Sequence, residues 1–145
     1  MDRLNFPDYN LENRIDAQKN SIFDLVRKKF IPLTPEEWVR QHCIELLIHQ
    51  YNIPLGRISV EKGLKYQSLQ KRFDILTLDS YGNAQILIEC KAPDVELTEK
   101  TLLQAGVYNS KLDSRFIWIT NGKNHIWMKK TNDKFELISF PMEID

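Results

Sequence analysis

The chain has 145 residues, of which 42% are hydrophobic and 28% charged, and this composition suits one compact globular domain. Lysine and arginine together number 20, as do aspartate and glutamate, so the formal net charge is zero. The absence of bulk positive charge argues against a protein that coats nucleic acid non-specifically, and any such contact must rest on a local basic patch.

The N-terminal part of the chain is expected to be an arm, residues 1–33, that packs a strand on the domain formed by residues 34–145. Its first twenty residues are polar and are interrupted by Pro7, which favours an extended segment. Residues 21–33 contain a β-prone run, so a strand or hairpin is expected before the first helix. The basic run that begins at Arg27 could contact a nucleic-acid backbone or keep the arm solvated.

The first helix has a clear beginning in the sequence TPEE. Thr34 suits the N-cap, Pro35 suits the first helical position, and Glu37 would complete a capping box. The helix is expected to run over 35–51, because the helix breaker Pro54 lies just beyond.

One face of this helix is apolar, and its members follow a helical spacing: Val39, Cys43, Leu46 and Leu47. Glu36 and Arg40 are four residues apart and project toward that side near the start of the helix, where we expect them to pair. Glu45 projects to the opposite side. Glu36 is therefore the acidic residue of this helix that could join a site.

The rest of the chain alternates between strand and helix patterns. In order these are strands over 57–65, 72–79 and 84–91, a helix over 98–112, a strand over 115–120, and hairpin strands over 124–130 and 134–140. Gly82 and Asn83 suit a tight turn, and Thr98 suits a helix N-cap. A helix between the third and fourth strands predicts a mixed sheet flanked by helices. The predicted fold class is α/β of the α+β kind, with an αβββαβ core.

Three charged residues interrupt the apolar strands. Glu89 and Lys91 lie two residues apart in one strand, and such residues share a face. Asp74 lies in the preceding strand. When the hairpin is paired outward from its turn with Asp79 opposite Ala84, Asp74 falls opposite Glu89. Two carboxylates and one ammonium are thus expected close together.

This cluster allows a structural and a chemical interpretation. Glu89 and Lys91 alone could form an ion pair at a sheet edge, and on that pair alone we favour a structural role. Asp74 changes the balance, because aspartate is disfavoured in strands and adjacent carboxylates repel each other unless a cation lies between them. Mg²⁺ prefers oxygen ligands and keeps several waters. Lys91 could orient or help to deprotonate such a water, or stabilise charge on a phosphate, which favours phosphodiester hydrolysis.

The order and spacing of these motifs resemble the PD-(D/E)XK nuclease superfamily. The chain more closely resembles the N-terminal nuclease domain of type I restriction enzyme R subunits, through the segments TPEEWVRQH, RFDIL, LIECKAP, LLQAGVYN and WITNG. The resemblance extends over residues 22–130. Phe73 stands where the superfamily motif has proline, which is a departure from the pattern.

The resemblance implies a restriction-endonuclease-like fold and a role for each matching residue. Asp74 and Glu89 would bind Mg²⁺, with Mn²⁺ as a substitute, and Lys91 would assist the attacking water. Gln104 and Tyr108 match a Q-x-x-x-Y element that would place the nucleic-acid strand, although residues at this spacing could also interact only with each other.

The resemblance also gives Glu36 a role, because the family has an acidic residue in its first helix. That residue would contact the metal through water or pair with Lys91 or Arg40. The first expectation is a Mg²⁺-dependent endonuclease or exonuclease domain of restriction-modification, with DNA as its partner. The alternative is a binding or interaction module that keeps the fold without cutting. No use of ATP is expected for this domain alone, and a homodimer is left open.

The remaining features favour a cytoplasmic protein that does not contact a membrane. No apolar run is long enough to span a bilayer, and Met1 precedes charged residues rather than the apolar segment of a signal peptide. Cys43 and Cys90 lie in apolar segments. We expect them to be small buried hydrophobic residues in a reducing compartment rather than a disulfide.

Overall fold

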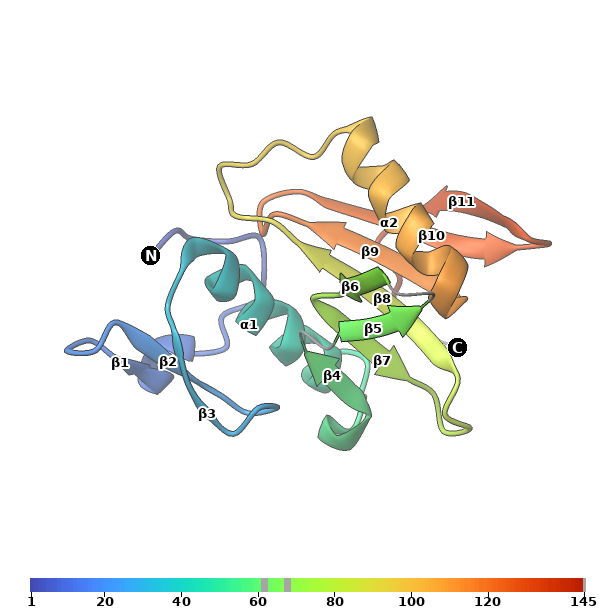
Figure 1. Cartoon of the computed structure of the whole chain (residues 1–145). Helices are drawn as coiled ribbons and strands as arrows, with labels where there is room; N and C mark the ends of the chain where they lie inside the picture. Colours follow the sequence, from blue (N-terminus) through green and yellow to red (C-terminus); the bar gives the residue numbers. More distant parts are fainter. Residues whose placement is uncertain (61–62, 67–68, 145) are drawn as a thin grey trace.

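The computed structural model (Figure 1) describes the backbone of residues 1–60, 63–66 and 69–144. Side chains are described for the same residues except 63–66, 69–72, 107–108 and 110–111. At the centre lies a six-stranded sheet with the strand order β11-β10-β9-β8-β7-β4.

The strands of this sheet are β4 (Ile58–Val60), β7 (Ile75–Leu78), β8 (Ala84–Cys90), β9 (Phe116–Thr120), β10 (His125–Thr131) and β11 (Lys134–Ile138). β8 and β9 run parallel, and the other neighbouring strands run antiparallel. The sheet is therefore mixed, as predicted.

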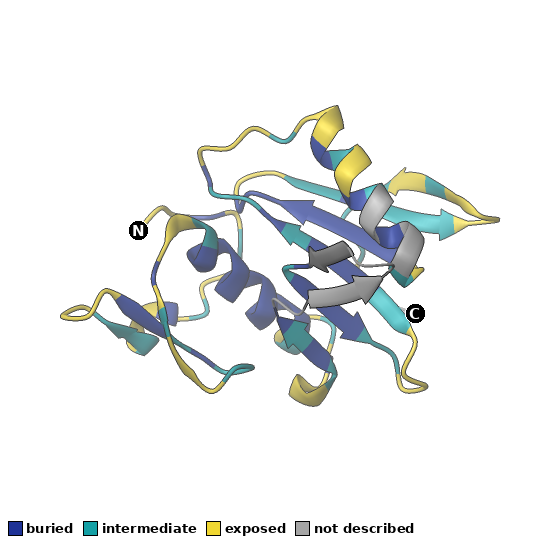
Figure 2. Cartoon of the chain, viewed as in Figure 1, coloured by how far each residue is buried: buried dark blue, intermediate teal, exposed yellow. Residues whose placement is uncertain are grey.

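Two α-helices are present in the described residues, α1 (Pro35–His49) and α2 (Glu99–Leu112). Cys43 of α1 belongs to the same buried cluster as Ile88 of β8, whereas Ala105 of α2 clusters with Ile117 of β9. Because the buried side chains of β8 and β9 point alternately to the two sides, the helices cover opposite faces. Figure 2 shows the central strands and the body of α1 as the buried part of the molecule. The order α1-β4-β7-β8-α2-β9 confirms the predicted αβββαβ core.

Capping side chains explain where both helices begin. Thr34 Oγ1 accepts the N–H of Glu37 at 3.0 Å, and Pro35 occupies the first turn, as predicted. The predicted return bond from the Glu37 carboxylate is wrong, because this carboxylate accepts hydrogen bonds from arginine and glutamine side chains instead. α1 ends two residues earlier than predicted, and α2 begins after Thr98 with a capping box.

The segment between β4 and β7 forms its own hairpin. The strand predicted over 57–65 corresponds to β4 up to Val60 and to part of a second strand from Gly63, and its residues 61–62 lie outside the described residues. The next described strands, β5 (Gly63–Tyr66) and β6 (Leu69–Arg72), pair with each other as a two-stranded sheet. The αβββαβ core therefore carries an inserted hairpin directly before β7.

The β7–β8 hairpin has the predicted turn but not the predicted pairing beside it. Gly82 adopts a positive φ of 84°, which glycine allows without strain. Ala84 pairs with Leu78 rather than with Asp79, because a register shift follows Thr77. Asp79 lies in the turn, where its carboxylate accepts two backbone N–H groups. Toward the other end the pairing follows the predicted count.

The N-terminal residues form a small sheet whose apolar side chains join the main core. Its strands are β1 (Ile15–Asp16), β2 (Ser21–Asp24) and β3 (Lys29–Pro32), in that order. Leu4, Leu11 and Ile22 are buried in the cluster that also contains the apolar face of α1. Figure 1 shows this small sheet beside α1, on the side away from α2.

Two smaller expectations can be compared directly with the structure. Within the described residues, no helix is both long and apolar enough to cross a bilayer. Cys43 and Cys90 are free and buried, with their sulfur atoms 3.9 Å apart, so the expectation of buried thiols without a disulfide is confirmed.

Candidate functional site

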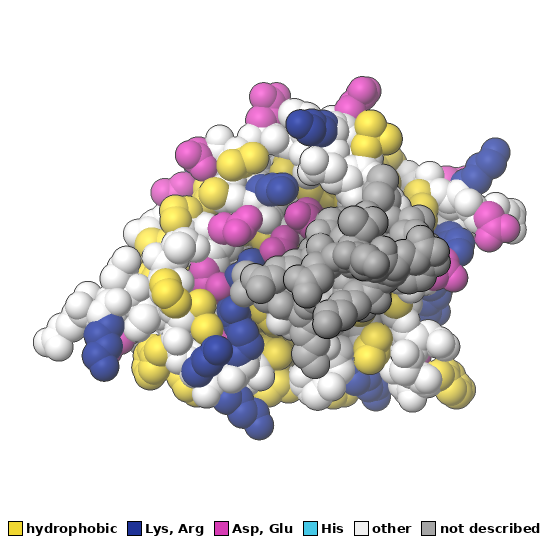
Figure 3. Space-filling view, in the orientation of Figure 1, with side chains coloured by type: hydrophobic (Ala, Val, Ile, Leu, Met, Phe, Trp, Pro, Cys, Tyr) yellow, Lys and Arg dark blue, Asp and Glu magenta, His cyan; other side chains and the backbone are white. Residues whose placement is uncertain are grey.

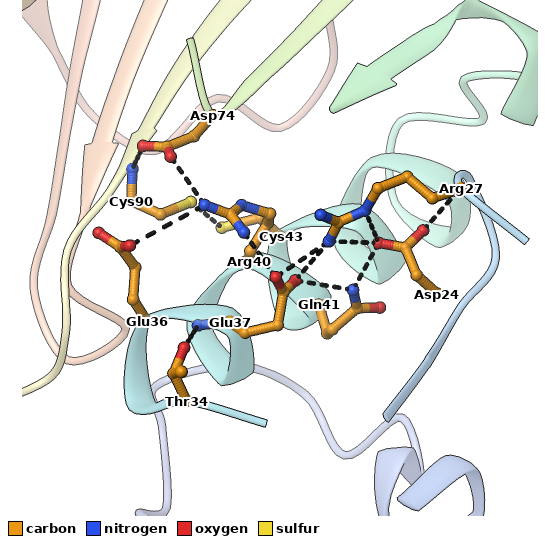
Figure 4. Close-up of polar contacts among 10 residues, drawn as sticks. All are labelled: Asp24, Arg27, Thr34, Glu36, Glu37, Arg40, Gln41, Cys43, Asp74 and Cys90. Carbon is orange, nitrogen blue, oxygen red and sulfur yellow. Dashed lines mark hydrogen bonds and ion pairs between the residues drawn. The ribbon is translucent and has the colours of Figure 1, made fainter. Parts of the chain in front are cut away.

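Asp74 lies in a bend immediately before β7, not inside a strand as predicted. Its carboxylate replaces a backbone acceptor at the end of the sheet, because Oδ2 accepts the backbone N–H of Cys90 at 2.7 Å (Figure 4). The other oxygen, Oδ1, accepts a hydrogen bond from Arg40 Nη2 at 2.9 Å. These two contacts hold a carboxylate that is only 16% exposed, at the point where β7 begins and β8 ends.

Glu89 and Lys91 lie next to this carboxylate. Glu89 is in β8, and Lys91 is the first residue after β8. Lys91 Nζ lies 3.5 Å from Glu89 Oε1, and both side chains are partly buried. Ile75 pairs with Ile88, so the chain continues with Asp74 beside Glu89, which is the neighbourhood that the sequence predicts. The structure thus brings these three predicted residues together.

Burial and neighbouring charge together raise the pKa of Glu89 to about 7. Burial has the largest effect, and the carboxylates of Asp74 and Glu36 raise the pKa further. Lys91 acts in the opposite direction as a nearby cation and hydrogen-bond donor. The surroundings of Glu89 therefore disfavour its ionised form, and a bound cation would favour that form.

Glu36 lies in the first turn of α1, on the side of the helix that faces Asp74 and Glu89. Its side chain is 46% exposed, and its Oε2 lies 3.9 Å from Arg40 Nη2. Glu45 instead pairs with Arg14 and His49, at 2.9 Å in each case. Of the acidic residues compared in the sequence, Glu36 is thus the one whose charge reaches the site.

The predicted strand-positioning pair on α2 is only partly described. Gln104 is exposed, and no hydrogen bond or ion pair joins it to the carboxylates within the part of the chain that the structure describes. Tyr108 belongs to α2, but its side chain lies outside the described residues.

A buried ionic network behind Asp74 is the feature that the sequence analysis missed. Arg40 Nη1 donates to Glu37 Oε1 at 2.6 Å, which is much closer than its predicted partner Glu36. Arg27 Nη2 binds both oxygens of Glu37, at 2.9 and 3.0 Å, and also pairs with Asp24. Arg27 is therefore part of the interior network rather than of a basic patch.

The sequence did contain a signal for this network. Glu37, Arg40 and Gln41 are spaced i, i+3 and i+4, so they form a polar stripe on a helix that is otherwise buried. All three are at most 3% exposed. Charged residues are almost never fully buried unless they are paired, so such a stripe indicates partners from another segment.

Acidic side chains gather on this face of the molecule, between α1 and α2, with lysine and arginine side chains beside them (Figure 3). Among the described residues, no group of three or more histidine, cysteine, aspartate or glutamate side chains is arranged to hold a metal ion. Mg²⁺, however, commonly uses only one or two carboxylates and keeps several waters.

The donor atoms of Asp74 and Glu89 suit a Mg²⁺ ion held in that way. An ionised carboxylate offers about four lone-pair sites, and the two hydrogen bonds to Asp74 use two of them. Glu89 adds a second carboxylate whose charge is poorly compensated. The site therefore combines hard oxygen donors with a carboxylate, that of Glu89, whose ionised form a cation would stabilise.

Comparisons with known proteins give one matching family model and a similar solved structure. No curated protein matches the sequence. A solved fragment described as an HsdR subunit of a type I restriction enzyme, from Vibrio vulnificus YJ016, is 26% identical, with a TM-score of 0.40. The match covers 63% of this chain and 18% of that chain. A family model for the type I restriction enzyme R protein N terminus (HSDR_N) matches residues 35–141. This chain belongs to that family, the N termini of the R proteins of type I restriction enzymes.

Proposed function

We propose that the chain is a metal-dependent nuclease domain of the PD-(D/E)XK type, which hydrolyses phosphodiester bonds in nucleic acid, with DNA as its first substrate. One observation carries this proposal. The Asp74 carboxylate lies beside Glu89 where β7 begins and β8 ends, and Lys91 follows on the same face within 3.5 Å of Glu89. Membership in a restriction-enzyme family supports the same conclusion.

Each residue of the cluster has a chemical role in this proposal. Asp74 and Glu89 would hold Mg²⁺, or Mn²⁺ in its place. When bound, the ion would polarise the phosphate and lower the pKa of a water molecule. Lys91 would donate a hydrogen bond to the attacking water or to a phosphate oxygen, where negative charge develops. Glu36, which is more exposed, would take part through a water or through Arg40.

Further parts of the proposal concern the substrate and the assembly. Gln104 and Tyr108 on α2 would help to place the nucleic-acid strand. Hydrolysis at this site would need no ATP, because water is the attacking group. Two copies of the chain could cut the two strands of a duplex.

A cleavage assay tests the proposed function. Wild-type protein, Asp74→Ala and Lys91→Ala are incubated with supercoiled, linear and single-stranded DNA and with RNA, each with Mn²⁺ or with EDTA. We expect Mn²⁺-dependent cleavage by wild type and a loss of at least about 100-fold in both variants, the scale of removing a general acid–base group. Equal cleavage by wild type and Lys91→Ala would assign the activity to a contaminant.

A second candidate is a module that binds nucleic acid without cutting it. One observation favours it, since both oxygens of Asp74 already accept hydrogen bonds from the protein. Calorimetric titration with Mn²⁺ separates the two candidates. Binding that disappears in Asp74→Ala supports the nuclease, whereas DNA binding without Asp74-dependent Mn²⁺ binding supports the module.

A further inference from the structure

Arg40 lies between a carboxylate of the site and a carboxylate behind it. Its side chain is 3% exposed, with Nη2 2.9 Å from Asp74 Oδ1 and Nη1 2.6 Å from Glu37 Oε1. A guanidinium is planar and carries donors along two edges, so one arginine can bind two carboxylates in a fixed geometry. Figure 4 shows the guanidinium of Arg40 extended between these two groups.

The position of Arg40 is fixed from the side of Glu37. Both oxygens of Glu37 bind Arg27, and Gln41 Nε2 donates to Glu37 Oε2 at 3.0 Å. Gln41 also donates to Asp24, which is held by the backbone of the β2–β3 turn. The guanidinium of Arg40 is therefore anchored through Glu37 to the N-terminal sheet.

Asp74, in contrast, lies outside the hydrogen-bonded strands. Because it precedes β7, its carboxylate is held by the two described contacts, Arg40 on one oxygen and the Cys90 N–H on the other. We propose that Arg40 is a positioning residue, which fixes the Asp74 carboxylate in the orientation in which it would bind the metal ion. This inference rests on the proposed function, but its first test does not require a metal.

Two effects of Arg40 on metal binding have opposite signs. As a nearby cation, Arg40 repels a divalent ion, so its removal would strengthen metal binding by simple electrostatics. As a positioning residue, it holds a ligand in place, so its removal would weaken metal binding. Residues that orient metal ligands typically contribute about 10–100-fold to affinity. The direction of the change therefore identifies the role.

The first experiment follows Asp74 without any metal. The amide proton of Cys90 reports on the hydrogen bond to Asp74, and its NMR shift is compared in wild type, Asp74→Ala and Arg40→Met. We expect both variants to move this proton upfield, in the same direction. Arg14→Met is the matched control, because Arg14 is a partly buried arginine that pairs with another carboxylate of α1, that of Glu45. We expect that variant to leave the Cys90 amide unchanged.

The second experiment measures Mn²⁺ affinity by calorimetry in EDTA-treated protein. We expect Arg40→Met to bind about 10–100-fold more weakly than wild type, and Arg14→Met to bind like wild type. Arg40→Lys keeps the positive charge but lacks the planar set of donors that binds two carboxylates, so this variant should also bind Mn²⁺ more weakly. Circular dichroism confirms folding, and Arg40→Lys serves alone if Arg40→Met does not fold.

The outcomes separate the inference from the proposed function. An unmoved Cys90 amide, or tighter Mn²⁺ binding in the Arg40 variants, would overturn the role of Arg40 and leave the nuclease proposal intact. A displaced amide in a protein whose wild type binds no Mn²⁺ would end the nuclease proposal, while Arg40 would still be shown to orient Asp74.

Discussion

The carboxylate of Asp74 accepts the backbone N–H of Cys90, so a side chain completes the hydrogen bonding at the end of a sheet. The residue proposed as a metal ligand therefore also stabilises the last residue of β8. Stability and metal binding should therefore both depend on Asp74, and they must be measured separately in every variant of this residue.

Replacing Asp74 with alanine is expected to lower the free energy of unfolding by about 2–4 kcal/mol, since the Cys90 N–H loses its acceptor and the buried Arg40 loses one carboxylate. Asp74→Asn should cost less, because its carbonyl oxygen can still accept one hydrogen bond. Urea unfolding of the three proteins measures both differences. Unchanged stability of Asp74→Ala would show that these contacts contribute nothing net.

Two adjacent glutamates provide a matched test of the buried network. Glu37 is buried and binds two arginines, whereas Glu36 is 46% exposed. Glu37→Gln should destabilise the protein by about 3–5 kcal/mol, because breaking a buried pair leaves charge uncompensated. Glu36→Gln should stay within about 0.5 kcal/mol of wild type. Similar effects of the two substitutions on urea unfolding would contradict this assignment of the network.

The raised pKa of Glu89 predicts a loss of stability with rising pH. Below the ordinary pKa of 4.5 both states are protonated, and between that value and about 7 only the unfolded chain releases its proton. The protonated Glu89 therefore contributes to the free energy of unfolding in acid, and this contribution is lost as the pH rises through about 7. The loss is at most about 3 kcal/mol. Urea unfolding at pH 5 and pH 8, in EDTA, measures the loss. Glu89→Gln should lack this contribution, and an equal pH dependence in both proteins would rule it out.

Gly122 and Gly106 should respond in opposite ways to alanine. Gly122 has a φ of 86°, and a Cβ there would lie 2.8 Å from a side-chain carbon of Leu4. Gly122→Ala should therefore destabilise the protein by about 1–3 kcal/mol through backbone strain and crowding. Gly106 lies in α2 with no described atom within 4 Å of its Cβ position, so Gly106→Ala should add about 0.5–1 kcal/mol. Thermal unfolding of the two variants provides the comparison, and a stabilised Gly122→Ala would contradict the geometry.

Local signals were sufficient for the elements and for the central cluster. Thr34 and Pro35 predicted the start of α1 because capping is decided by adjacent residues. Pairing counted from the turn placed Asp74 beside Glu89 correctly, although the pairing at Asp79 was wrong. The irregularity after Thr77 shifts the register only near the turn, so the count is restored at the site.

The buried network could not be predicted from the same local signals. Glu37 looked like a capping residue and Arg27 like part of a basic run, because the partner of each lies ten residues away. Likewise, the strand expected over 57–65 corresponds to two described strands, β4 and β5, and β5 pairs with β6 rather than with the central sheet. Interactions between distant segments decide these features. The polar stripe on α1 indicates that partners exist, but its spacing does not tell which residues they are.

The contact between Arg27 and Glu37 also bears on where an autonomous folding unit begins. The family match begins at residue 35, yet Glu37 is neutralised by an arginine that lies before that point, and Leu11 and Ile22 fill the same core as α1. The segment that folds cooperatively should therefore begin earlier in the chain than the segment that matches the family model. Residues 1–34, which precede the family match, would here be a folding partner of the site.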